Sequence, residues 1–230
     1  MSNQWPDNLS YKTFSKVVEQ RPETFYRELF KQHQFSIKNE RIAIKNLQKI
    51  CEATFVLSNE KGFQAMTLRQ LSEKTGMSMG GLYAYIQSKD DLATLIYSFL
   101  ERYCSDKLTI LVSDKLSTNK QLIALIHAHI YLSELMQPWF YFAYMETKNL
   151  AKSFKGAAIQ SEIKMEDKIF QLIKNNNSLS TEKAQLTASL VKAMLQDWYL
   201  KRWKYKKRKI SVDKYAEQVV DILITYINRA

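Results

Sequence analysis

The chain has 230 residues, of which 46% are hydrophobic, and it holds only five Gly, three Pro and two Cys. This composition excludes an intrinsically disordered or disulfide-rich protein, and the scarcity of Gly and Pro favours long helices over a β-rich fold. The formal net charge of +11 favours a polyanionic partner, with nucleic acid as the first candidate.

The positive charge is concentrated near the C-terminal end. Residues 201–230 hold nine Lys or Arg against three Asp or Glu, whereas the earlier parts of the chain carry only a small positive excess. Charge alone therefore does not locate a nucleic-acid site, and such a site has to be identified from a motif.

Few residues have the spacing of a metal or catalytic site. Cys51 and Cys104 have no CxxC or Cys/His partner, so we expect two buried thiols. His127 and His129 are two residues apart on a predicted helix, where their side chains point in different directions. No GxSxG, P-loop or GxGxxG motif is present. We expect no metal, no cofactor and no enzymatic activity.

The sequence has no pattern of a secretion signal or membrane segment. Its first residues lack a basic stretch followed by an apolar one, and no run approaches the ~18 uncharged apolar residues that a membrane helix needs. We expect a soluble, cytoplasmic protein without a membrane partner.

Residues 1–38 form a predicted N-terminal extension. Apolar spacing within 13–20 and 23–32 predicts one or two short helices there. The extension is rich in aromatic residues, and these can dock on the rest of the protein. A mobile arm is the alternative. The aromatic residues are Trp5, Phe14, Phe25, Tyr26 and Phe30.

From Asn39 to Lys61, apolar residues recur every three or four positions, which predicts an amphipathic helix. Gly62 is expected to end it in the left-handed conformation. Thr67 and Gln70 then have the spacing of a capping box for a short helix.

The short helix over 67–75 ends at Gly76 in this interpretation, and Ser78 can cap a further helix over 79–86. A long helix begins near Lys89. Two short capped helices joined by a Gly-containing turn, behind a longer helix, are the layout of a helix-turn-helix.

The rest of the chain is predicted to be helix after helix. No segment has the strict alternation of a half-buried strand, so we assign no sheet and an all-α fold. The predicted helices cover 119–136, with Pro138 as a stop, then 139–149, 154–175, 181–207 and 212–228.

The stretch GFQAMTLRQLSEKTGMSMGGLYAYIQSKDDL, residues 62–92, resembles the TetR family of bacterial transcriptional regulators. The likeness covers roughly residues 42–92, and beyond it only helical layout and length agree. It implies a helix-turn-helix domain over 39–90 that binds double-stranded operator DNA. It also implies a helical domain over 91–230 that binds a small effector and forms a homodimer.

The resemblance implies which residues contact DNA. Tyr83, Tyr85, Thr67 and Lys89 are expected at the sugar-phosphate backbone, although Tyr85 also fits an ordinary half-buried aromatic and Lys89 a solvated lysine at a helix start. The N-terminus of the helix capped by Ser78 offers free N–H groups. The remaining predicted contacts are Arg69, Met79, Gly80 and Gly81.

The predicted helix over 79–86 departs from the usual family pattern. Gly81 stands where a small residue with a β-carbon is common, and each glycine weakens a helix by about 1 kcal/mol relative to alanine. Consecutive Gly80 and Gly81 also let the backbone approach DNA closely, while apolar Met79 favours thymine-methyl contact. The helix therefore gives no base-specific code.

The resemblance also implies an effector site in the C-terminal domain. The aromatic segment MQPWFYFAYMETKN, residues 136–149, favours an apolar tunnel, and a plain aromatic core explains the segment equally well. A likeness to fatty-acid-responsive members suggests a hydrophobic effector such as an acyl-CoA. The predicted lining residues are Tyr131, Trp139, Phe142, Tyr144, Met145, Trp198 and Tyr199.

The basic run KRWKYKKRK, residues 201–209, fits either a solvated helix end or a site for the phosphates of such an effector. The helices over 181–207 and 212–228 have apolar faces that can form a four-helix dimer interface. The predicted interface residues are Leu190, Ala193, Met194, Val219, Ile222, Leu223 and Tyr226.

The leading hypothesis is a repressor released from its operator by a hydrophobic effector. A helix-turn-helix protein that organises the chromosome or acts through a protein partner, without small-molecule control, is the first alternative. A basic helical protein of the membrane surface, or a lipid carrier, is the second.

Overall fold

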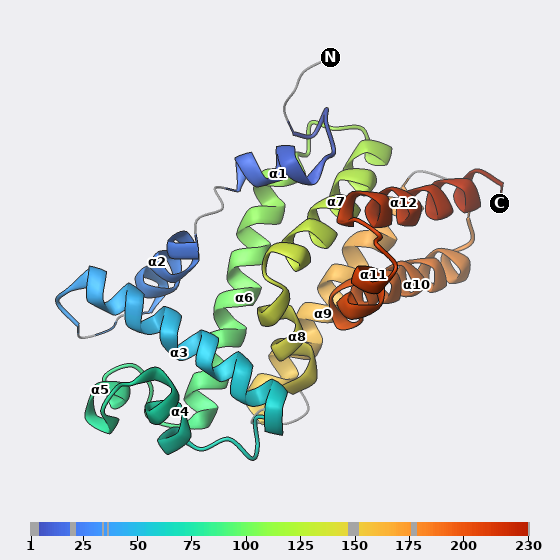
Figure 1. The fold of residues 1–230 in the computed structure, drawn as a ribbon. Coiled ribbons are helices and arrows are strands. Elements are labelled where there is room, and N and C mark those ends of the chain that lie inside the picture. The colour runs from blue at the N-terminus through green and yellow to red at the C-terminus, as the bar shows by residue number, and fades with distance from the viewer. Residues whose placement is uncertain are drawn as a thin grey trace. The chain divides into compact units, whose positions relative to one another are not determined.

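A computed structural model describes residues 5–18, 22–33, 35, 37–146, 152–175 and 179–229. Throughout these ranges the regular structure is helical and contains no strand (Figure 1). The predicted all-α fold is confirmed. No helix of the described residues is long and apolar enough to cross a bilayer.

The helices follow one another with short connections. Their bounds are α1 Tyr11–Val17, α2 Pro22–Gln32, α3 Glu40–Lys61, α4 Leu68–Thr75, α5 Met79–Tyr83, α6 Lys89–Leu111, α7 Thr118–Leu135, α8 Gln137–Glu146, α9 Lys152–Lys174, α10 Thr181–Leu200, α11 Arg202–Lys207 and α12 Val212–Arg229.

Three predicted boundaries differ from the structure. The helix expected over 181–207 is broken at Lys201, where φ is −118° and ψ is 34°. The bend allows Tyr205 to stack on Trp198 with 5.0 Å between ring centroids. Gly62 has a positive φ of 82°, but its ψ of 145° is extended rather than left-handed helical.

Pro138 follows the end of α7 at Leu135, as the sequence predicts. It also lies in the first turn of α8, where a missing N–H removes no helical hydrogen bond. The helix expected over 79–86 is shorter, because α5 ends at Tyr83. The last residues of the helix expected over 139–149 lie outside the described residues.

The chain divides into two compact units. The body unit comprises residues 1–18, 103–137 and 157–230, and the head unit comprises residues 19–102 and 138–156. The predicted extension over 1–38 is therefore shared, with α1 in the body unit and α2 in the head unit.

The core of the head unit holds the helix-turn-helix together. α3 packs on α2 and α4, and α4 packs on α5. The apolar side chains of this core include Leu47, Ile50, Leu71, Leu82 and Ile86, all of them buried. Burying each of them completely contributes about 1.5–3 kcal/mol.

In the body unit, the N-terminal segment is docked rather than extended as an arm. Phe14 is fully buried, and its ring lies 5.4 Å from that of Tyr131 on α7. The indole Nε1 of Trp5 donates to the carbonyl of Leu111 at 2.9 Å. The backbone N–H of Tyr11 donates to the carboxylate of Asp213, which also accepts from the hydroxyl of Tyr131.

A second anchor of the body unit is the carboxylate of Glu134 on α7. It accepts two hydrogen bonds from the guanidinium of Arg202, at 2.6 and 2.8 Å, and one from the indole of Trp198 at 3.0 Å. The guanidinium also lies 4.6 Å from the Trp198 ring centroid. This bidentate, stacked geometry requires arginine rather than lysine.

Replacing Phe14 by Ala tests the docking of α1. We expect Phe14→Ala to lower the free energy of unfolding by about 3–5 kcal/mol, because it opens a cavity at a fully buried aromatic position. Chemical denaturation measures the loss. Val17→Ala on the exposed side of the same helix is the matched control, with an expected change within about 0.5 kcal/mol. Equal stabilities of both variants would show that α1 does not anchor the body unit.

The three histidines predict how stability depends on pH. Burial lowers the pKa values of His33, His127 and His129, and the cation of Lys192 lowers that of His129 further. Because the unfolded chain then binds more protons below its histidine pKa of about 6.5, the free energy of unfolding should be smaller at about pH 5.5 than at about pH 7.5. Denaturant titrations at both pH values measure the difference, and His129→Gln should reduce it. A pH-independent value would contradict the burial.

Candidate nucleic-acid interface

We call α4, α5 and the turn between them, residues 67–83, the candidate reading head. Its first helix, α4, begins with the capping box that the sequence predicts. The Thr67 hydroxyl accepts from the backbone N–H of Gln70 at 3.2 Å, and the Gln70 side chain accepts from the N–H of Thr67 at 3.1 Å. Both bonds satisfy N–H groups that have no acceptor within the helix. The start of α4 is therefore fixed by its own sequence.

The turn from α4 to α5 is closed by glycine and by a serine side chain. Gly76 has φ 69° and ψ 18°, the left-handed conformation predicted for it. The N–H of Met77 donates to the carbonyl of Ser72, and the Ser72 hydroxyl donates back to the carbonyl of Met77. A residue with a side chain at position 76 would be strained, so this angle between the helices depends on glycine.

The second helix, α5, is only five residues long and is capped by Ser78. The Ser78 hydroxyl accepts from the N–H of Gly81 at 3.1 Å. Leu82 is fully buried and fastens α5 to the head-unit core, while Tyr83 is 41% exposed. A β-carbon at Gly80 would meet no atom within 4 Å, so the backbone is open to solvent there.

The nine predicted DNA contacts differ in accessibility. Eight of them have exposed or half-exposed side chains or, for the glycines, backbone. Tyr85 alone among the nine is buried. The exposed members are Thr67, Arg69, Ser78, Gly80 and Tyr83, and the half-exposed members are Met79, Gly81 and Lys89.

Tyr85 is buried and bonds within the head unit, as a packed aromatic side chain does. Its hydroxyl accepts a hydrogen bond from the Asn46 side chain on α3 at 3.0 Å, and its ring lies 5.8 Å from that of Phe35. Burial raises the pKa of the Tyr85 hydroxyl. The residue joins α3 to the segment after α5, and the spacing of Asn46 in the sequence gives no signal of this bond.

Lys89 is half-exposed, and its ammonium bonds to backbone carbonyls within the head unit. Its Nζ donates to the carbonyl of Gln64 at 2.7 Å and to that of Phe63 at 3.3 Å. The same Nζ lies 5.7 Å from the Phe63 ring centroid. Lys89 therefore ties the start of α6 to the connection between α3 and α4.

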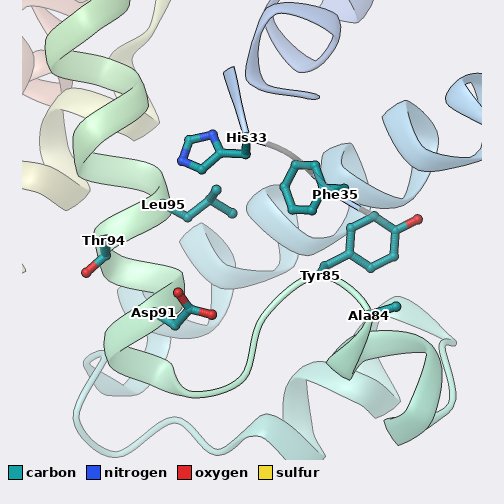
Figure 2. A pocket seen from close by; sticks show the side chains of 7 residues that line it. All are labelled: His33, Phe35, Ala84, Tyr85, Asp91, Thr94 and Leu95. Atoms are coloured by element: carbon teal, nitrogen blue, oxygen red, sulfur yellow. The ribbon is translucent and has the colours of Figure 1, made fainter. Parts of the chain in front are cut away.

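A cavity of about 280 Å³ lies beside the segment that follows α5. Asp91, Thr94 and Leu95 line it from α6, and Figure 2 shows these residues on that helix. The Asp91 carboxylate accepts from the N–H of Gln87 at 2.8 Å and so helps to cap α6. The volume is at the lower limit for a small-molecule site. The other lining residues are His33, Phe35, Ala84 and Tyr85.

The predicted effector-binding residues are divided between the two units. In the head unit, Trp139 is packed edge-on against Phe55, with 5.1 Å between ring centroids, and Phe142 packs in the same way against Phe63. Both belong to the core. Tyr144 and Met145, one turn further along α8, are exposed.

The other three predicted effector residues belong to the body unit. Tyr131 and Trp198 are fully buried, and Tyr199 is nearly so. Phe14 of the N-terminal segment packs on Tyr131. The Trp198 indole donates a hydrogen bond to Glu134, and the Arg202 guanidinium lies over its ring. The aromatic-core interpretation therefore accounts for five of the seven residues, since only Tyr144 and Met145 have exposed side chains.

The basic run is partly neutralised. Lys201 and Lys204 form ion pairs with the Asp197 carboxylate at 2.7 and 2.6 Å, and Arg202 pairs with Glu134. Burial alone would raise the pKa of Asp197, but hydrogen bonds from Lys201, Lys204 and Tyr205 lower it to about 2. Lys201 remains exposed in its ion pair, and residues 206–209 are exposed cations for which the described part of the chain provides no ion pair.

The predicted dimer residues are divided between core and surface. Val219 and Leu223 are buried within the chain, because this side of α12 packs on α7. Ile222 and Tyr226 lie on the exposed side of α12. On α10, Leu190 and Ala193 are exposed and Met194 is half-exposed.

One family model matches the chain. Residues 50–96 match the model of bacterial regulatory proteins of the TetR family. This range includes both helices of the reading head and the first residues of α6. No curated protein sequence matches the chain.

Solved structures share the fold at low sequence identity. A TetR-family regulatory protein from Rhodococcus RHA1 has 15% identity and a TM-score of 0.65, with 78% of this chain and 97% of that chain covered. The fatty acid degradation regulator FadR from Bacillus halodurans has 17% identity and a TM-score of 0.58, with 76% and 92% covered. The chain therefore shares the all-α fold of these proteins, and its residues 50–96 are similar to the bacterial regulatory proteins of the TetR family.

Proposed function

We propose that the chain is a transcriptional regulator of the TetR type, a repressor that binds a near-palindromic operator as a homodimer, with α5 in the major groove. The observation that carries the proposal is that α4 and α5 each have one buried side and one side exposed to solvent. Leu71 and Leu82 anchor the helices in the core, while Arg69, Gly80 and Tyr83 face solvent. Major-groove readers of this kind use the exposed side of the second helix.

The accessible groups fit contacts to the DNA backbone better than base-specific readout. The hydroxyls of Thr67, Ser78 and Tyr83 and the guanidinium of Arg69 can reach phosphates, which position the protein without reading sequence. Met79 supplies an apolar contact suited to a thymine methyl. Arg69 already forms an i,i+4 ion pair with Glu73 at 3.5 Å, but both side chains are largely exposed, so this pair can exchange for a phosphate at little cost.

Lys89 and Tyr85 contribute to operator binding indirectly in this proposal. Their bonds to Gln64 and Asn46 fix the helices that carry the contacting groups. A direct phosphate contact by Lys89 would require its ammonium to give up two carbonyl acceptors. The sequence resemblance implies the direct role, and the bonds in the free protein favour the positioning role.

The dimer interface is proposed on the outer sides of α10 and α12, which pack on each other in the body unit. Leu186, Leu190, Ile222 and Tyr226 are exposed there, and no single protomer covers them. Ala193 and Met194 complete the surface. Apolar residues repeated along two adjacent helices are what a four-helix interface buries.

We also propose release by a small hydrophobic effector, with a fatty acyl compound as the candidate. The fold is shared with a protein described as a fatty acid degradation regulator, which supports this class without assigning it. Trp139, Phe142, Tyr131, Trp198 and Tyr199 would line the site only after side chains of the core rearrange. Tyr144 and Met145 are accessible without such a change.

Substitution of the two tyrosines separates contact from support. Tyr83→Phe removes an exposed hydroxyl, so we expect operator affinity to fall about ten- to a hundredfold, the effect of one lost hydrogen bond to a charged group, with unchanged stability. Fluorescence anisotropy with the DNA upstream of the protein's own gene measures the affinity. Tyr85→Phe is the matched control, and it should lower stability slightly with a smaller change in affinity.

The same assay tests the whole proposal. Salt-sensitive and sequence-dependent binding is expected, and a long-chain acyl compound should release the DNA. Equal affinity for the upstream DNA and for unrelated DNA would contradict operator recognition, and release by no acyl compound would contradict the effector class.

Gly80→Ala tests how closely the backbone of α5 approaches DNA. The free protein has room for the new β-carbon, so we expect the free energy of unfolding to rise by about 0.5–1 kcal/mol. Operator affinity should nevertheless fall, because the methyl group would lie between backbone and DNA. Denaturation and anisotropy on one preparation measure both effects. Tighter binding by the stabilised variant would place Gly80 away from the DNA.

A further inference from the structure

The end of α11 and the turn that follows it carry four adjacent cations. Lys206, Lys207, Arg208 and Lys209 are all exposed, and in the described part of the chain none of them forms an ion pair with a carboxylate within 4.0 Å. Together with Trp203 on α11, we call these residues the basic turn. Their mutual repulsion is unfavourable in the isolated protein.

The cations just before the basic turn behave differently. Lys201, Arg202 and Lys204 each have a carboxylate partner on α7 or α10. Three cations of the run form ion pairs, whereas the four that follow form none in the described part of the chain. Solvation of a helix end therefore does not explain the whole run.

Trp203 is the most exposed tryptophan of the described residues. It is 67% exposed, whereas Trp139 and Trp198 are buried. A large aromatic side chain close in sequence to four cations presents apolar area and positive charge on one short segment. Isolated exposed apolar residues are common, but a tryptophan at this exposure next to a charge cluster indicates a contact surface.

The basic turn has a lysine, Lys209, at a backbone position where glycine is the common residue. The N–H of Ile210 donates to the carbonyl of Tyr205 at 3.0 Å, which closes the C-terminus of α11 around Lys209. Lys209 has a φ of 55°, a left-handed conformation in which glycine is the common residue. A lysine there adds backbone strain as well as a fourth adjacent charge, and local strain of this kind is a feature of functional sites.

We propose that the basic turn is a peripheral contact for an anionic phospholipid surface. Tryptophan is favoured at the level of the lipid headgroups, and adjacent Lys or Arg residues are attracted to an anionic leaflet, each strengthening partitioning roughly fivefold. An apolar residue and a polybasic cluster are the two signals that reversible membrane binding needs. This contact is independent of operator binding by the head unit.

Other polyanions fit the basic turn less well. Duplex DNA satisfies the cations but offers the indole no exposed base to stack on, since such stacking requires single strands. A protein interface buries about 800 Å² on each partner and is depleted in lysine, whereas the basic turn is a short segment that contains three lysines. A planar anionic surface matches both the shape and the composition.

Vesicle co-sedimentation of the full-length protein tests the proposal. Vesicles of phosphatidylcholine with phosphatidylglycerol are compared with vesicles of phosphatidylcholine alone, at salt of about 0.1 M and about 1 M, where the screening length falls from about 10 to about 3 Å. We expect binding only to the anionic vesicles, and mainly at the lower salt. Replacing Lys206, Lys207, Arg208 and Lys209 together by Gln should lower partitioning at least tenfold.

A charge-matched control separates the basic turn from net charge. It replaces four exposed lysines elsewhere in the body unit by Gln, and it should keep most of the vesicle binding. The control positions are Lys16, Lys164, Lys168 and Lys183. Tryptophan emission should shift to shorter wavelength on anionic vesicles, and Trp203→Phe should abolish that shift.

Four outcomes would overturn the proposal. They are no sedimentation, equal sedimentation with both kinds of vesicle, equal losses in the two four-residue variants, and an altered oligomeric state of Trp203→Phe on gel filtration. The last would show that a second copy of the chain covers the indole. Loss of non-specific DNA affinity with retained vesicle binding in the Gln variant would assign the basic turn to nucleic acid.

Lys209→Gly tests the strain separately. Glycine adopts the left-handed conformation without strain, so the variant should have a Tm about 2–4 °C higher and weaker vesicle binding. An unchanged or lower Tm would contradict the inference that Lys209 is kept at the expense of stability.

Discussion

The reading head depends on one constraint: α5 is too short and too rich in glycine to be stable alone. An isolated helix of five residues with two glycines does not form in water, because nucleation is unfavourable and glycine opposes it. Its conformation therefore comes from its surroundings. The Ser78 cap, the left-handed Gly76 and the burial of Leu82 each supply a part of it.

The same constraint explains the positions of Lys89 and Tyr85. Both side chains reach across the head unit and bond to groups distant in sequence, the Gln64 carbonyl and the Asn46 amide. These bonds hold the ends of α3 and α6 around the reading head. In a domain with so short a second helix, Lys89 and Tyr85 support the helices that carry the proposed DNA contacts.

The charges of the chain have two different uses. In the body unit, Asp197 forms ion pairs with Lys201 and Lys204, and Glu134 forms one with Arg202. Both carboxylates are largely buried, and the pairs stabilise the bend between α10 and α11. The cations beyond the bend remain exposed. Net charge is therefore a poor guide to the proposed DNA site.

The sequence by itself determined the elements whose signals are local. The capping box at Thr67, the left-handed Gly76 and the cap at Ser78 form as expected, because each depends on residues within a few positions of one another. The all-α fold follows equally from the helical spacing of apolar residues. Family likeness over the same stretch is the basis of the proposed function.

Only the tertiary structure decided which side chains are free. The aromatic segment of α8 gave no indication that Trp139 and Phe142 belong to the head-unit core, since an aromatic residue suits a core or a cavity equally. The sequence likewise could not show that Lys89 has two carbonyl acceptors or that Arg202 meets Glu134. Those partners lie 25 to 68 positions away, and chain folding alone brings them within hydrogen-bond distance.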